Sequence, residues 1–127
     1  MPPLNTIVGW TSITAGFAAG MLLGLGFHRE NWLGGYLSFS RQLLRLGHIA
    51  MISLGMINVL YGMTVASLSM TPDRITLTKW GFIVGNITMP LTCGLVAFRP
   101  AGRMLFAIPV AALLTAGITL CIAMVSP

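Results

Sequence analysis

Charged residues are scarce in this sequence, and acidic ones are the scarcest. Only 7% of the 127 residues are charged, and Asp and Glu together number two, whereas an ordinary soluble domain has about 25% charged residues. Hydrophobic residues make up 56% of the chain, and the mean hydropathy is +0.90. This composition excludes an ordinary soluble domain and predicts an integral membrane protein.

The missing residues also exclude several functions. Both carboxylates, Glu30 and Asp73, lie outside the long apolar runs. A small multidrug exporter resembles this chain in length and helix count, but it needs a carboxylate inside the membrane. There is no phosphate-binding loop, no paired carboxylates and no Ser-His-Asp set, so we do not expect an enzyme that is catalytic by itself.

The cysteines and the net charge exclude two further kinds of protein. The only cysteines, Cys93 and Cys121, lie within apolar runs and lack CxxC spacing, so a disulfide framework is not expected. The net charge of +5 comes from arginines at the predicted membrane edges. It therefore does not indicate a nucleic-acid partner.

The few charged residues divide the chain into four uncharged runs, each close to or above the roughly 20 residues that cross a hydrocarbon core. The runs are 1–27, 46–72, 80–98 and 104–127. We predict an all-α integral membrane protein, a single domain over 1–127, with four transmembrane helices in an up-down bundle with short loops. The expected helices cover about 5–27, 42–67, 72–98 and 103–125.

The basic residues predict the orientation of these helices. The first and third connections carry five arginines, whereas the second carries only Arg74 and Lys79. The side richer in Lys and Arg normally faces the cytoplasm. We therefore expect a multi-pass protein of a bacterial-type inner membrane, with both termini on the outer face. The five arginines are Arg29, Arg41, Arg45, Arg99 and Arg103.

Glycines four residues apart mark two faces for close helix contact. The first helix carries Gly16, Gly20 and Gly24 on one face, and the third carries Gly81 and Gly85. Membrane helices associate by tight packing, which small residues permit. We favour packing inside the bundle over the alternative, a contact surface for a partner subunit.

The second helix carries nearly all its polar groups on one face. This face consists of residues spaced three or four apart, which share one side of a helix. Polar side chains in a membrane normally turn toward a bundle interior or a cavity, so we expect this face to look inward. Its residues are Arg41, Arg45, His48, Met51, Gly55, Asn58 and Gly62.

His48 has three competing explanations. It is a buried neutral histidine with a polar partner, or the axial ligand of a b-type haem, or a participant in quinone, copper or proton handling. In the haem hypothesis His48 is the metal ligand, Gly55 leaves room for the macrocycle, and Arg41 and Arg45 hold the propionates.

A six-coordinate haem needs a second ligand at the same depth. The other histidine, His28, is about two turns too shallow. Met21 and Met89 lie near the required level, but the chain has nine methionines and methionine is a common core filler. The second ligand therefore stays open, as does the haem itself.

The overall pattern of four short-looped helices, one intramembrane histidine and flanking arginines resembles the small membrane-anchor subunits of respiratory complexes. Such subunits carry haem b or border a quinone site. The resemblance implies a hydrophobic, non-catalytic subunit of an electron-transfer complex, embedded in lipid and bound to other membrane subunits or to copies of itself. The alternatives are a cofactor-free accessory or assembly subunit and a small channel or transporter.

The charge asymmetry generates a test of topology. A cysteine introduced at Ser38 should react with a membrane-impermeant thiol reagent only after permeabilisation, whereas one at Ser126 should react from outside. The opposite labelling pattern would reverse the orientation and place His48 nearer the outer face.

Overall fold

The protein folds into four long antiparallel helices. The computed structural model describes residues 3–125, which are all-helical, with 88% helix and no strands. The position Ser126 chosen for labelling lies outside the described residues. The long helices are α1 (Leu4–Gly26), α2 (Phe39–Thr64), α3 (Pro72–Phe98) and α4 (Ala107–Val125), and the short 3-10 helices are η1 (Trp32–Gly34), η2 (Val65–Ser67) and η3 (Pro100–Phe106).

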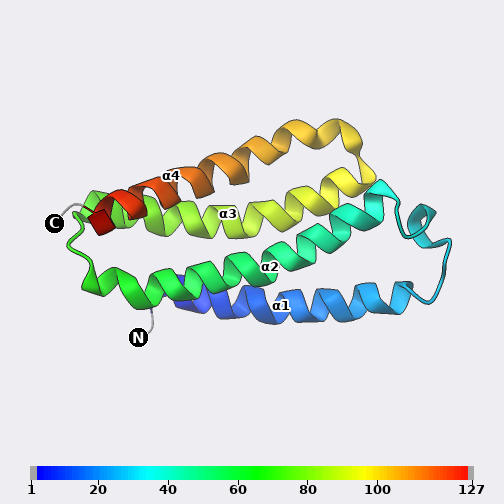
Figure 1. Cartoon of the computed structure of the whole chain (residues 1–127), viewed down its shortest axis with the longest axis horizontal. Coiled ribbons are helices and arrows are strands. Elements are labelled where there is room, and N and C mark those ends of the chain that lie inside the picture. The colour runs from blue at the N-terminus through cyan, green and yellow to red at the C-terminus, as the bar shows by residue number, and fades with distance from the viewer. Residues whose placement is uncertain (1–2, 126–127) are drawn as a thin grey trace.

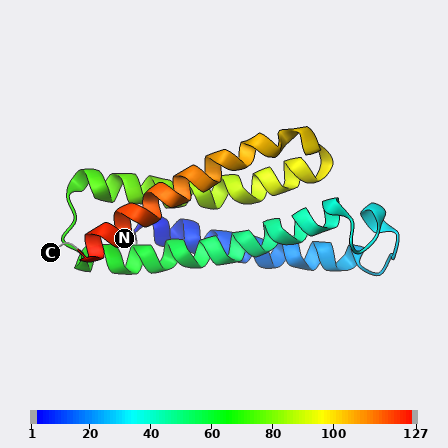
Figure 2. The ribbon, with the colours of Figure 1, turned by 45° about the horizontal axis from the view of Figure 1, so that its top comes forward.

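The helices pack in the order of the chain (Figure 1). The main contacts join α1 to α2, α2 to α3 and α3 to α4, with a smaller contact between α1 and α3. Successive helices run in opposite directions, so the start of α1 and the end of α4 lie at the same end of the molecule (Figure 1). In the turned view α4 crosses α3 obliquely (Figure 2). We call the opposite end, with η1 and η3, the arginine end.

Two helix starts differ from the sequence prediction for local reasons. The helix expected from about residue 42 begins at Phe39, because the Ser38 hydroxyl accepts a hydrogen bond from the Arg41 backbone N–H at 3.3 Å and caps the helix. The helix expected from about 103 is a 3-10 helix up to Phe106, and regular α-helix starts at Ala107.

Glycines bring α1 and α2 into backbone contact. A Cβ added at Gly55 would lie 2.8 Å from the Gly9 carbonyl oxygen, and one at Gly9 would lie 2.5 Å from the Gly55 oxygen. Gly16 faces Ile52 and the His48 carbonyl in the same way. Because an added side chain at any of these glycines would collide with the facing helix, the register of the two helices is narrowly defined.

The glycines of α3 serve the contact with α4. A Cβ at Gly81 would meet Ala116 at 2.7 Å, and one at Gly85 would overlap the side chain of Leu113. Beside them Tyr61, Phe82 and Ala116 form the buried apolar core cluster. Gly16, Gly81 and Gly85 thus pack inside the chain, as does Gly20, whereas Gly24 has nothing within 4 Å of its added Cβ.

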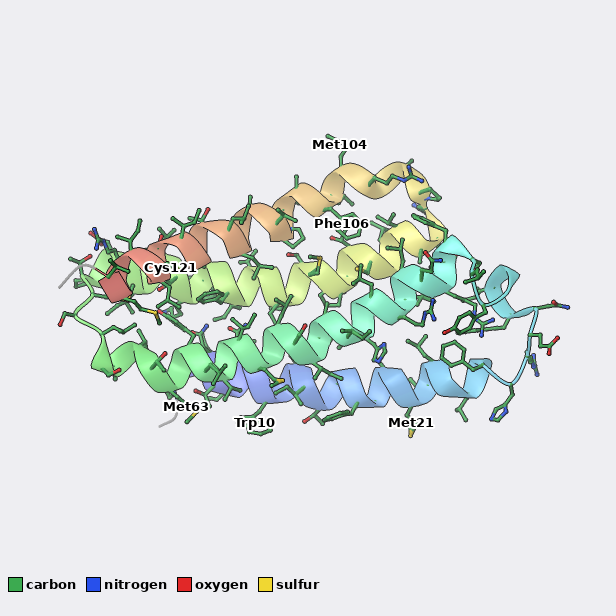
Figure 3. The ribbon with its side chains drawn as sticks, in the orientation of Figure 1. Trp10, Met21, Met63, Met104, Phe106 and Cys121 are labelled. Atoms are coloured by element: carbon green, nitrogen blue, oxygen red, sulfur yellow. The ribbon has the colours of Figure 1, made fainter. Side chains whose placement is uncertain are left out.

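The outer helices leave most of their apolar surface exposed. All four helices are long and apolar enough to cross a membrane. Only 17% of the apolar window of α1 and 11% of that of α4 are buried, against 33% and 44% for α2 and α3. The labelled side chains Trp10, Met21, Met63 and Met104 point outward (Figure 3).

These contacts predict opposite outcomes for two glycines. Gly55→Leu should disrupt the α1–α2 contact and lower the thermal unfolding midpoint in detergent, because its side chain would meet the Gly9 backbone. Gly24→Leu should leave the midpoint near that of the native protein, because its side chain meets no neighbour. Equal midpoints for the two variants would contradict this packing.

Candidate functional site

Two adjoining cavities form a groove between α1 and α3, with α2 as its floor. Their volumes are about 490 and 360 Å³, and Met51 and Pro90 line both. The larger cavity is lined by Ile7, Val8, Thr11, Ser12, Ala15, Met51, Asn86, Ile87, Pro90 and Leu91. The smaller is lined by Ala19, Leu22, Leu23, Trp32, Leu44, Gly47, His48, Met51, Pro90 and Gly94. The walls are apolar apart from a few hydrogen-bonding groups, as in many small-molecule sites.

Small residues create the space in the smaller cavity. Gly94 lies on α3, and no atom comes within 4 Å of a Cβ added there. Ala19 on α1 and Gly47 on α2 are also small. Gly47 packs closely on α3, because a Cβ added there would lie 3.1 Å from the Cβ of Cys93. The α3 wall is therefore open at Gly94, while α2 and α3 stay tightly packed beneath it.

His48 is half-buried in this cavity, with its ring against α1. A Cβ added at Gly20 would lie 3.1 Å from Cδ2 and 3.4 Å from Nε2 of His48, so the glycine makes space for the imidazole. Nδ1 is buried and has no hydrogen-bond partner among the described residues. The polar partner expected for a buried neutral His48, a carbonyl or an Asn, Ser or Thr side chain, is not found at Nδ1 in residues 3–125.

The imidazole of His48 can form a hydrogen bond with a bound molecule. A neutral imidazole carries its proton on one nitrogen and a lone pair on the other. In either tautomer one ring nitrogen is a donor, so His48 can donate one hydrogen bond to a bound acceptor.

The structure does not bring the proposed haem residues together. Gly55 contacts Gly9 and Ile13 of α1, so it leaves no room for a flat macrocycle. Met21 is 66% exposed and points away from the other helices (Figure 3). Met89 is half-buried and is not among the residues that line the His48 cavity. The sulfur-bearing side chain that does share this cavity is Met51, one turn from His48 on the same helix.

Metal ligands are equally dispersed. Within residues 3–125 no group of three or more His, Cys, Asp or Glu side chains is placed to hold a metal ion. His28 is exposed in the loop after α1, and Cys93 is buried between α2 and α3.

The two arginines of α2 lie near aromatic rings at the arginine end. The Arg41 guanidinium carbon is 4.8 Å from the centre of the Phe27 ring and 5.5 Å from that of Trp32. Arg45 lies over Tyr36 at 4.5 Å. Trp32, which adjoins Arg41, also lines the His48 cavity, whereas neither arginine lines it.

A polar network lies toward the other end of α2. Of its two asparagines only Asn58 belongs to the polar face predicted from the sequence. Asn58 accepts a 2.8 Å hydrogen bond from Asn5 and donates to the Phe82 carbonyl at 3.1 Å. The Asn5 amide also donates to the Lys79 carbonyl at 3.2 Å. Both asparagines are buried. Asn5 lies near the start of α1, and only its pairing partner across the helices shows its role.

Ser12 makes a second polar link, midway along the groove. Its hydroxyl is 2.9 Å from the Met51 carbonyl and 3.0 Å from Oδ1 of Asn86. A hydroxyl has one proton, and Asn oxygen and nitrogen are assigned from the hydrogen-bond network. The Ser12 hydroxyl can therefore donate to either of these two oxygens, but to only one of them at a time.

The sequence matches no known protein family, and no curated protein or solved structure is significantly similar to it. The function of the groove must therefore be argued from the contacts of this chain.

The buried asparagine pair predicts a loss of stability on substitution. Asn58→Leu leaves the Asn5 amide and the Phe82 carbonyl without this partner, and we expect a cost of about 1–2 kcal/mol in the free energy of unfolding. Thr14→Val is the control, because Thr14 bonds only to Trp10 of its own helix and is exposed. Unfolding curves in detergent that coincide for both variants would show that the pair contributes nothing.

Proposed function

We propose that this chain is a small membrane-embedded subunit of an electron-transfer complex, and that its groove binds a quinone-class molecule whose carbonyl oxygen accepts a hydrogen bond from His48. The observation that carries the proposal is the position of His48. It is a half-buried imidazole whose Nδ1 has no hydrogen-bond partner in residues 3–125, and it lines an otherwise apolar cavity of about 360 Å³.

Membrane insertion is supported by the exposed surface. Large apolar side chains are exposed along all four helices, and a soluble protein rarely exposes apolar patches of this extent. The arginine end would face the cytoplasm of a bacterial-type inner membrane, with the start of α1 and the end of α4 on the outer side.

A quinone suits the groove better than a haem. A quinone is a lipid-soluble ring with carbonyl acceptors and an apolar tail, and the groove offers a donor with an apolar channel that continues past Met51 and Pro90. A haem held by His48 lacks the space expected at Gly55 and the second ligands expected at Met21 or Met89. A five-coordinate haem on His48 is the competing outcome of the test.

Partner subunits are part of the proposal. In this proposal other subunits exchange electrons with the bound quinone, and residues 3–125 hold no cluster of three or more His, Cys, Asp or Glu side chains for a metal centre. The outer faces of α1 and α4 are the least buried, so they are the surfaces on which other membrane subunits, or further copies of this chain, would pack. A cofactor-free accessory subunit would use the same faces but would leave the groove unoccupied by quinone.

Closing the groove should abolish quinone binding. Gly94→Leu places a side chain at the wall of the His48 cavity, where an added Cβ meets no atom within 4 Å, and Gly117→Leu is a matched control because the space at Gly117 on α4 is equally open. We expect a decyl-substituted benzoquinone to quench the fluorescence of Trp32 in the native protein and the Gly117 variant, but not in the Gly94 variant. Trp10 and Trp80, replaced by Phe, would not contribute.

His48→Ala should weaken the same binding about threefold to tenfold, the loss of one hydrogen bond. His28→Ala is the control, since His28 is exposed in the loop. Identical quenching in the Gly94 and Gly117 variants would overturn the quinone proposal. A Soret band in the native protein that disappears in His48→Ala would replace it with the haem.

A further inference from the structure

A third cavity, separate from the groove, lies at the arginine end. Its volume is about 530 Å³, and it is lined by Phe27, Glu30, Tyr36 and Arg41. Phe27 and Glu30 belong to the segment after α1, Tyr36 to the segment before α2, and Arg41 to the first turn of α2. The cavity is thus built by the first connection folding back on the start of α2.

Arg41 is the unusual residue of this cavity, because it is a charged side chain only 3% exposed. A guanidinium has five N–H donors. Within residues 3–125 it makes one hydrogen bond, from Nη1 to the Glu30 backbone carbonyl at 3.2 Å, and Nε is buried without a partner. A buried charge normally has a counter-charge and satisfied donors.

Aromatic rings surround Arg41 without meeting this need. The rings of Phe27, Trp32 and Tyr36 have their centres 4.8, 5.5 and 5.8 Å from its guanidinium carbon. Gly26 admits the Trp32 indole, which would lie 2.7 Å from an added Cβ. Ring faces attract the cation, but they accept none of its hydrogen bonds in the plane of the guanidinium. We call the rings of Phe27, Trp32 and Tyr36 the aromatic cage. This cage holds the guanidinium in place but leaves most of its N–H donors without acceptors.

A second cation adjoins the same cage. Arg45, one turn further along α2, lies over the Tyr36 ring at 4.5 Å. The carboxylate of Glu30 is exposed and forms no ion pair with either arginine in the described part of the chain. Even with Glu30 ionised, the two arginines leave a local charge of one positive unit. The N-terminus of α2, capped by Ser38, adds the positive end of a helix dipole.

We propose that this cavity binds the phosphate group of an anionic membrane lipid, with Arg41 and Arg45 as the cationic partners. Arginine forms directed, charge-assisted hydrogen bonds with phosphate oxygens. The cavity lies at the end of four apolar helices, where phosphate head groups are found if the helices span a bilayer. The proposal rests on the membrane insertion proposed above, but not on quinone binding.

Lipid retention by the full-length protein tests the site directly. Detergent-purified protein is mixed with phosphatidylglycerol or phosphatidylcholine, and bound lipid is counted by native mass spectrometry. We expect the native protein to retain phosphatidylglycerol in preference. Arg41→Gln should weaken retention about tenfold, the effect of losing one charge-assisted hydrogen bond, and Arg41→Lys should restore part of it.

Arg103→Gln is the matched control. Arg103 also lies over an aromatic ring, Phe39 at 5.3 Å, at the same end of the molecule, but it is exposed and lines none of the three cavities. Arg103→Gln removes the same charge as Arg41→Gln. If the site rather than the net charge determines lipid binding, Arg103→Gln should change lipid retention less than twofold. Arg45→Gln supplies a second variant if Arg41→Gln does not fold.

The competing sources of phosphate are separated in the same assay. Displacement of the lipid by millimolar inorganic phosphate would identify a soluble phosphate as the ligand and overturn the lipid assignment. Equal retention of the two lipids, or equal effects of Arg41→Gln and Arg103→Gln, would overturn the site. Because no quinone is present, failure here leaves the groove proposal untouched, and thiol labelling at Ser38 tests membrane insertion separately.

Discussion

Where Gly9 meets Gly55, the backbones of α1 and α2 touch with no side chain between them, and the other features of the molecule depend on this contact. It sets the register of the two helices. That register brings Gly20 opposite His48, Asn5 opposite Asn58 and Ser12 opposite the Met51 carbonyl. A side chain at either glycine would separate the helices and lengthen these contacts together.

The polar groups of the interior fall into two kinds. Asn5, Asn58 and Ser12 find partners on neighbouring helices, so their burial stabilises the packing. His48 and Arg41 are buried to different degrees, and each has a nitrogen with no partner in residues 3–125. Both lie beside a cavity. Unpaired buried polar groups are rare in proteins and call for an explanation, and at both places the neighbouring cavity could admit a molecule that bonds to the same side chain.

The two proposed sites share Trp32 as a boundary. Its indole lines the His48 cavity and also forms part of the cage around Arg41. The backbone before α2 is unusual here, because Leu33 has a φ of 52° and is followed by Gly34 at 84° and Gly35 at 92°. Positive φ at a leucine is unfavourable and requires support from its surroundings. The loop therefore holds Trp32 in a defined place between two sites of different chemistry.

The sequence by itself determined the helices, because their length and apolar character depend on composition over each run. The range 72–98 coincides with α3, and the polar face of α2 contains His48 and both arginines. The sequence could not determine which residues of neighbouring helices each side chain contacts. Gly55 was expected to leave space and instead contacts Gly9, and Met21 was expected near His48 and instead points outward. Helical spacing gives the face of a residue but not the rotation of the helix against its neighbours. Only the packing of α1 and α3 on α2 created the groove, whose lining residues lie far apart in the chain, and only the folding of the first connection onto the start of α2 created the arginine cavity.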